Sequence, residues 1–209
     1  MPTRRKRPTA ASTPPAIIRP IDASRLKTYP LQRRHSKVQV SNFAKVWTKG
    51  RSFARFLDSL PDILAVKTLR EVAKAIAKAH RNGKPVIVGM GAHVVKVGLG
   101  PLLVDLMERG IVTALAMNGA VIIHDFELAF MGHTSEEVDA EIDSGRFGMA
   151  EETGRMLNEA ITLGMKEGQG LGESLGSYIH RRKQLFPHRA TSLLATGFRL
   201  GLPVTVHVA

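Results

Sequence analysis

The densest group of titratable side chains in an apolar stretch of this sequence is His124, Asp125 and Glu127. Val121-Ile122-Ile123 precede the group and Leu128-Ala129-Phe130-Met131 follow it. Side chains three positions apart on a helix are neighbours, so His124 and Glu127 would share one face. A carboxylate beside an imidazole can orient the ring as a general acid or base. We therefore predict catalytic roles for His124, Asp125 and Glu127.

The same three residues also fit a purely structural role. Histidines and carboxylates near the start of a helix often cap it by hydrogen bonding to backbone groups. Metal binding would need a further ligand, which only His93 or His133 could supply, and we expect no metal here. The sequence leaves the catalytic and the capping interpretation open.

Two apolar runs, 85–89 and 112–117, end in small residues where a ligand could approach the backbone. Such runs are typical of buried parallel strands, whose carboxyl ends meet at one edge of a sheet. Position 94 is Val and not the third glycine of a dinucleotide fingerprint, and Asn118 stands where an acid would bind a ribose. The pattern predicts a crevice for phosphate or ribose, although tight turns alone would explain the same residues. The candidate cofactor-binding residues are Gly89, Gly91, Ala92, His93, Gly98, Asn118, Gly119 and Ala120.

Apolar residues recur at helical spacing before, between and after these two runs, and the apolar run 203–208 predicts a third strand. Strands that alternate with helices indicate an α/β domain with a Rossmann-like parallel sheet flanked by helices, over residues 35–209. A domain of this class rarely ends on a strand, so we expect the sequence to be incomplete at its C-terminus. The expected helices cover 53–60, 62–81, 94–109, 122–131, 150–166, 175–184 and 190–200, and one more begins at Thr134-Ser135-Glu136-Glu137.

The net charge of +12 is concentrated at the start of the chain. Residues 1–56 hold 14 Lys or Arg and the single acid Asp22, whereas the remainder is near neutral. Proline accompanies the basic run 4–7, so residues 1–34 are expected to form a disordered basic arm, through which alone nucleic acid would bind. No apolar run approaches the ~20 residues of a membrane span, and no signal peptide is present, which predicts a soluble, cytoplasmic protein.

Residues 84–160 resemble the deoxyhypusine synthase family. In that family a strand ends in a Thr-Ser-Asn loop and a second strand ends in Ala-Gly-Gly followed closely by acids. The counterparts here are Gly91-Ala92-His93 with Gly98, then Asn118-Gly119-Ala120, then His124-Asp125. In addition, Gly145-Arg146-Phe147-Gly148 is similar to the family's Arg-Ile-Gly-Asn stretch.

The resemblance implies an NAD-binding fold of Rossmann type and a homo-oligomer, usually a tetramer. The prototype oxidises spermidine with NAD and moves its aminobutyl group to a lysine of a translation initiation factor. This chain would then be an NAD-dependent transferase acting on a polyamine or a related amine. The reactive lysine of the family would lie beyond Ala209. The alternative is a non-catalytic relative that serves as a binding or assembly module.

Overall fold

A computed structural model describes residues 21–208 of the chain. Three parallel strands form the sheet in the order β1-β2-β3: Ile87–Met90, Ala114–Asn118 and Val204–His207. Because β1 pairs with β2 and β2 with β3 in parallel, the carboxyl ends of all three strands lie at the same edge. The predicted pairing of the first two strands is confirmed.

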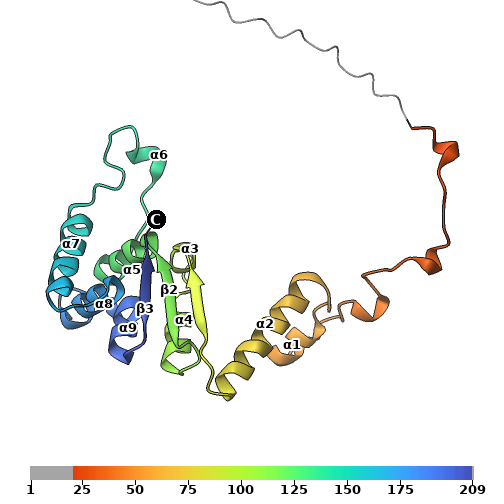
Figure 1. Cartoon of the computed structure of the whole chain (residues 1–209), viewed down its shortest axis with the longest axis horizontal. Coiled ribbons are helices and arrows are strands. Elements are labelled where there is room, and N and C mark those ends of the chain that lie inside the picture. Colours follow the sequence, from red (N-terminus) through yellow and green to blue (C-terminus); the bar gives the residue numbers. More distant parts are fainter. Residues whose placement is uncertain (1–20, 209) are drawn as a thin grey trace, which may run out of the picture.

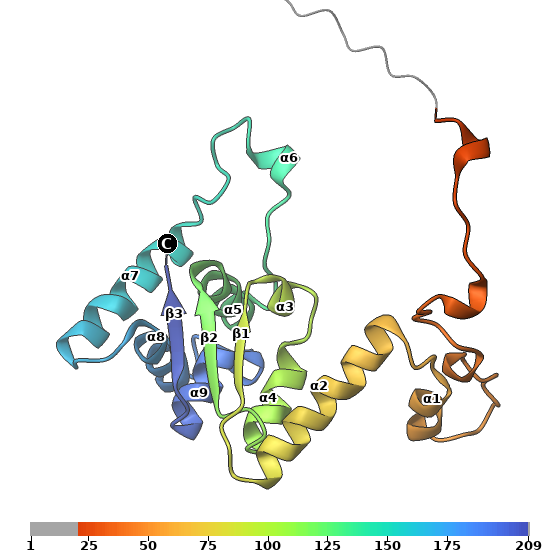
Figure 2. The ribbon, with the colours of Figure 1, turned by 45° about the vertical axis from the view of Figure 1, so that its right-hand side comes forward.

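The sheet buries one of its faces. Figure 2 shows the three strands in front of a layer that contains α4, α5, α8 and α9. Successive side chains of a strand point to opposite faces, and here every second residue joins the core. On the other face, Ile87 is 65% exposed. The residues that face the helices are Val88, Met90, Leu115, Met117, Val204 and Val206.

Two short helices, and not the single helix expected over 94–109, connect β1 to β2. They are α3, His93–Lys96, and α4, Gly100–Glu108. Gly98 lies between them with φ of +83°, a conformation that interrupts a helix and that glycine adopts without steric penalty. Pro101 lies at the start of α4, where the absence of an N–H costs no helical hydrogen bond.

Helix α5, Gly119–Met131, begins directly where β2 ends. Asn118 caps it, since its side-chain oxygen accepts a hydrogen bond from the Val121 N–H at 3.2 Å. Gly132 ends the helix with φ of +77°. A direct transition of this kind places the first turn of α5 at the carboxyl edge of the sheet.

The last third of the chain is helical and forms much of the core. Helices α7, Glu151–Lys166, α8, Leu171–Arg181, and α9, Leu193–Leu200, follow the single turn α6, Val138–Glu141. The turn η4, Arg189–Thr191, precedes α9. Among the fully buried side chains is Phe126 of α5, whose ring meets that of Phe186 edge-on at 5.3 Å. The predicted helices of this region are present, with starts and ends shifted by a few residues.

No residue of the described segment before β1, 21–86, is buried. It consists of the turns Ala23–Arg25, Leu31–Arg33 and Val40–Asn42, and the helices α1, Phe53–Ser59, and α2, Leu64–Arg81. Figure 1 shows α1 to one side of the body that holds the sheet. The apolar stripe of α2 predicted a packed helix, yet Leu69 and Val72 are at least half exposed. Within residues 21–208, no helix combines the length and the hydropathy of a bilayer span.

The expected basic arm, residues 1–34, lies partly outside the described residues, which begin at Ile21. Residues 21–34 are exposed along their whole length. The boundary between arm and domain therefore stays a prediction.

Candidate functional site

His124 and Glu127 face one another on α5 and are joined through a threonine. Nδ1 of His124 lies 2.7 Å from Oγ1 of Thr134, and that hydroxyl donates to Oε2 of Glu127. The hydroxyl of Thr153 donates to the other carboxylate oxygen at 3.1 Å. Thr134 comes from the loop after α5 and Thr153 from the start of α7, so three segments of the chain meet at Glu127.

This network assigns the tautomer of His124. A hydroxyl has one proton, and the proton of Thr134 is donated to Glu127. Nδ1 of His124 must therefore donate to Thr134, which leaves the lone pair of the neutral ring on Nε2. The carboxylate thus orients the ring through the hydroxyl, because its own distance to Nδ1 is 3.8 Å.

The electrostatic surroundings favour the neutral ring. Burial, the largest effect, lowers the pKa of His124 below its usual value, Glu127 opposes the shift and Lys96 of α3 adds to it. A neutral imidazole with an oriented Nε2 lone pair is a proton acceptor at neutral pH. His124 lies six positions after the cap Asn118, or about 9 Å along the helix, so this base is close to the carboxyl edge of the sheet.

We expect Thr134→Val to change the proton position on His124. Without the hydroxyl, Nδ1–H loses its acceptor, and the ring is free to carry its proton on Nε2. The ¹⁵N chemical shifts of the ring, measured above its pKa, should show protonated Nδ1 in the wild type and a shift towards protonated Nε2 in the variant. Thr162→Val is the control, because that hydroxyl bonds the carbonyl of Asn158 elsewhere on α7. Identical ring shifts in wild type and Thr134→Val would contradict the assignment.

An acidic cavity of about 360 Å³ adjoins the network. Glu127, Glu136 and Glu152 contribute carboxylates to its wall, and neither Lys nor Arg lines it among the described residues. The carboxylate of Glu136 also accepts a hydrogen bond from the Gly148 N–H at 3.0 Å, which holds the loop between α6 and α7 beside the cavity. The remaining lining residues are Phe130, Met131, His133, Thr134, Ser135, Ala150 and Thr153.

Asp125 does not join His124 and Glu127. It is 1% exposed, and its carboxylate accepts hydrogen bonds from the Ser192 hydroxyl at 2.6 Å and from the N–H groups of Leu193 and Leu194 at 2.7 and 3.3 Å. One step along a helix rotates the side chain by about 100°, so neighbours in sequence point to different faces. Asp125 therefore caps a helix, as the alternative interpretation proposed, but the helix is the distant α9.

The candidate cofactor-binding residues cluster around the carboxyl edge of the sheet. A Cβ on Gly91 would lie 3.6 Å from Nδ2 of Asn118, so the ends of β1 and β2 are close neighbours. A Cβ on Gly119 would lie 3.0 Å from Cγ1 of Val208, next to the end of β3. The other candidates are Gly89 within β1, Ala92 just after it, His93 at the start of α3, Gly98 after α3, and Ala120 in the first turn of α5. NAD binding by this group stays a prediction.

Sequence reasoning missed the residues that surround Glu127. The spacing of Thr134 to Glu137 indicates the start of a helix, but α6 begins only at Val138 and the Thr134 hydroxyl bonds Glu127. Thr153 and Glu152 carry no local signal, because a threonine and a glutamate in the first turn of a helix are ordinary. Only the packing of α7 beside α5 brings them to the cavity.

Comparisons with known proteins correct the expected family. No protein-family model matches the chain, and no curated protein matches it. A solved apo structure of ArgZ, an arginine dihydrolase from the ornithine-ammonia cycle in Cyanobacteria, is similar at 15% identity and a TM-score of 0.45. The match covers 70% of this chain and 19% of that protein.

The predicted membership of the deoxyhypusine synthase family is wrong: no model of that family and no curated member of it matches the chain, and the similar solved structure is that of an arginine dihydrolase. The NAD-dependent transferase function was inferred from this resemblance and is corrected together with it. The alternative of a non-catalytic relative of the same family falls with the family. A short apolar strand that ends in small residues, followed by a helix, is common to many α/β proteins, so the matched segments were not specific to one family.

Proposed function

We propose that the chain binds a small organic cation, an ammonium or a guanidinium, in the acidic cavity. The observation that carries the proposal is the lining of the cavity, where three glutamates face a common space without a Lys or Arg among the described lining residues. Like charges that meet in one cavity repel each other, and a bound cation relieves the repulsion.

The shape and the apolar part of the cavity fit a small molecule. Its volume of about 360 Å³ is in the lower part of the range of small-molecule sites, about 300–1,000 Å³. Phe130, Met131 and Ala150 offer apolar contact to a carbon skeleton. Charge-assisted hydrogen bonds from N–H donors to the carboxylates are stronger than neutral ones and fix the orientation of the cationic head.

His124 does not line the cavity, but it contacts Thr134 and Glu127, which do. Its Nε2 carries the lone pair, and its lowered pKa keeps it unprotonated at neutral pH. The carboxylate of Glu127 orients the neutral ring through Thr134.

Glu127→Gln should weaken the binding of n-butylammonium and n-butylguanidinium at least about 10-fold, which corresponds to about 1.4 kcal/mol. The change keeps the size of the side chain and removes the carboxylate that both threonines hold. Binding is measured by isothermal titration calorimetry on the full chain, with 1-butanol as the neutral analogue that is expected not to bind.

Glu152→Gln and Glu151→Gln form the matched pair of controls. The two residues are adjacent in the first turn of α7, but Glu152 lines the cavity and Glu151 pairs with Arg155 at 2.6 Å. We expect Glu152→Gln to weaken the binding of both cations and Glu151→Gln to leave it unchanged. Equal affinity for the cations and for 1-butanol, or equal losses in the paired variants, would refute a cation site.

A further inference from the structure

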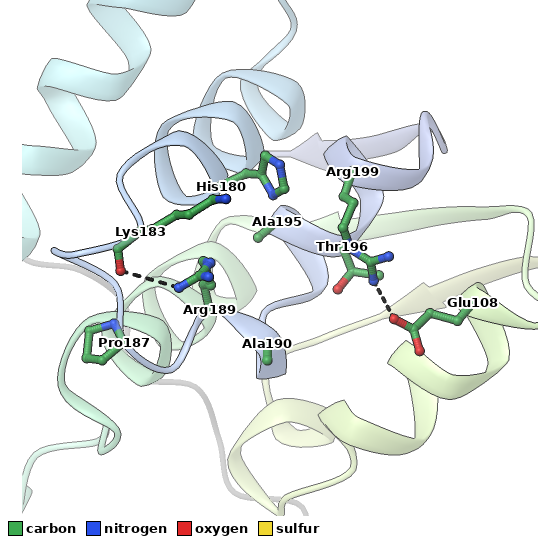
Figure 3. Close-up of a pocket in the computed structure, with 9 residues that line it drawn as sticks. All are labelled: Glu108, His180, Lys183, Pro187, Arg189, Ala190, Ala195, Thr196 and Arg199. Carbon is green, nitrogen blue, oxygen red and sulfur yellow. Dashed lines mark hydrogen bonds and ion pairs between the residues drawn. The ribbon is translucent and has the colours of Figure 1, made fainter.

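We propose that a second, basic cavity binds a small molecule that carries a phosphate group. It has a volume of about 480 Å³ and is separate from the acidic cavity, with which it shares no lining residue. Figure 3 shows its lining side chains, which include His180, Lys183, Arg189 and Arg199. The proposal does not depend on the cation site.

The four basic side chains come from separate parts of the fold. His180 lies in the last turn of α8 and Lys183 just after that helix, while Arg189 belongs to η4 and Arg199 to the last turn of α9. The helix dipole accounts for a cation at the end of one helix. It does not account for the meeting of these segments around one cavity.

Most of this positive charge has no carboxylate partner. Arg199 pairs with Glu108 of α4, which is the one carboxylate among the described residues that line the cavity; both side chains of this pair are more than 40% accessible. Among the described residues, the guanidinium of Arg189 donates only to the backbone carbonyls of Lys183 and Phe186, at 3.3 and 3.5 Å, which hold it in place without neutralising it. Within residues 21–208, Lys183 and His180 form no ion pair.

These positive charges also act on the pKa of the His180 imidazole. Burial lowers the pKa of His180 most, and the charges of Lys183, Arg199, Arg189 and Arg181 lower it further. A bound anion would reverse the effect of these charges. The pKa of His180 is therefore a local reporter of an anion in this cavity.

Phosphate is the anion that this donor set fits best. A planar guanidinium offers paired N–H donors to two phosphate oxygens, and an ammonium adds a point charge. The cavity exceeds the size of a bare ion, so an organic group attached to the phosphate has room beside Pro187, Ala190 and Ala195. Oligonucleotides and anionic vesicles carry phosphate on a much larger body, so they serve in the test as the competing sources of this anion.

The test uses the full chain with inorganic pyrophosphate as the probe. Saturating pyrophosphate should raise the pKa of His180 by about one unit, followed by NMR of the ring protons. The basic residues 1–56 also attract anions, but none of residues 21–56 lines the cavity, and the pKa of His180 reports binding within the cavity. Lys183→Gln and Arg189→Gln should each weaken pyrophosphate binding at least about 10-fold in calorimetry.

Arg181→Gln is the matched control, because it removes one charge from the same helix end at a residue that does not line the cavity. It should change the affinity less than about threefold. If Arg189→Gln fails to fold, the exposed Lys183 carries the test, since its side chain has no structural partner among the described residues. Equal losses in Lys183→Gln and Arg181→Gln, an unshifted His180 pKa, or a shift with anionic vesicles or oligonucleotides but not with pyrophosphate would overturn the proposal.

Discussion

Gly172→Ala should destabilise the chain by about 3 kcal/mol or more. A Cβ at this position would lie 2.9 Å from the carbonyl carbon of Val204 and closer still to its oxygen. The obstacle is the backbone of β3, which cannot move away without breaking its pairing with β2. Gly176, one turn further along α8, packs in the same way against the backbone of Leu194 in α9. Helix α8 therefore needs a face without side chains.

Gly154→Ala is the control for this prediction. Gly154 lies in α7, where no atom comes within 4 Å of an added Cβ, so alanine should stabilise the chain by about 0.5–1 kcal/mol through its higher helix propensity. Urea unfolding followed by circular dichroism measures both changes. A Gly172→Ala variant that unfolds at the wild-type urea concentration would show that α8 does not pack this closely.

Asp125→Ala should lower the free energy of unfolding by about 3–5 kcal/mol. The carboxylate satisfies the Ser192 hydroxyl and two N–H groups at the start of α9, and alanine would leave these donors buried without an acceptor. The exposed Asp105→Ala, which removes only a surface pair with Arg109, should change the stability by less than about 0.5 kcal/mol. A similar small effect in both variants would contradict the role assigned to Asp125.

The contribution of Asp125 should also depend on pH. Burial raises its pKa to about 6, although the three donors oppose the shift, and the pKa in the unfolded chain is about 3.9. Between these two values the folded chain binds more protons than the unfolded chain, so stability from this group falls as the pH rises from about 4 to 6. The stability difference between wild type and Asp125→Ala should decrease over this range and stay constant above it.

Local patterns predicted the secondary structure well. Apolar runs predicted β1, β2 and β3, and small residues after the run marked the ends of the first two, because a buried strand and the turn after it impose their residue types locally. The same rules failed where a glycine interrupts a helical pattern, as at Gly98, and where capping residues are used for another purpose, as at Thr134. The apolar stripe of α2 predicted that this helix is buried, but a stripe alone does not show whether another element of the chain packs against it.

The sequence by itself determined that this is an α/β chain with parallel strands and that a polar group follows the second strand within an apolar helix. Only the tertiary structure decided the roles within that group. Glu127 is joined to His124 by Thr134, whereas Asp125, two positions away, bonds Ser192, 67 residues further along the chain. The same is true of both cavities, each of which has a charged wall built from several separate elements. A helix turns each successive side chain by about 100°, and the partner that each side chain meets depends on long-range packing that no local pattern contains.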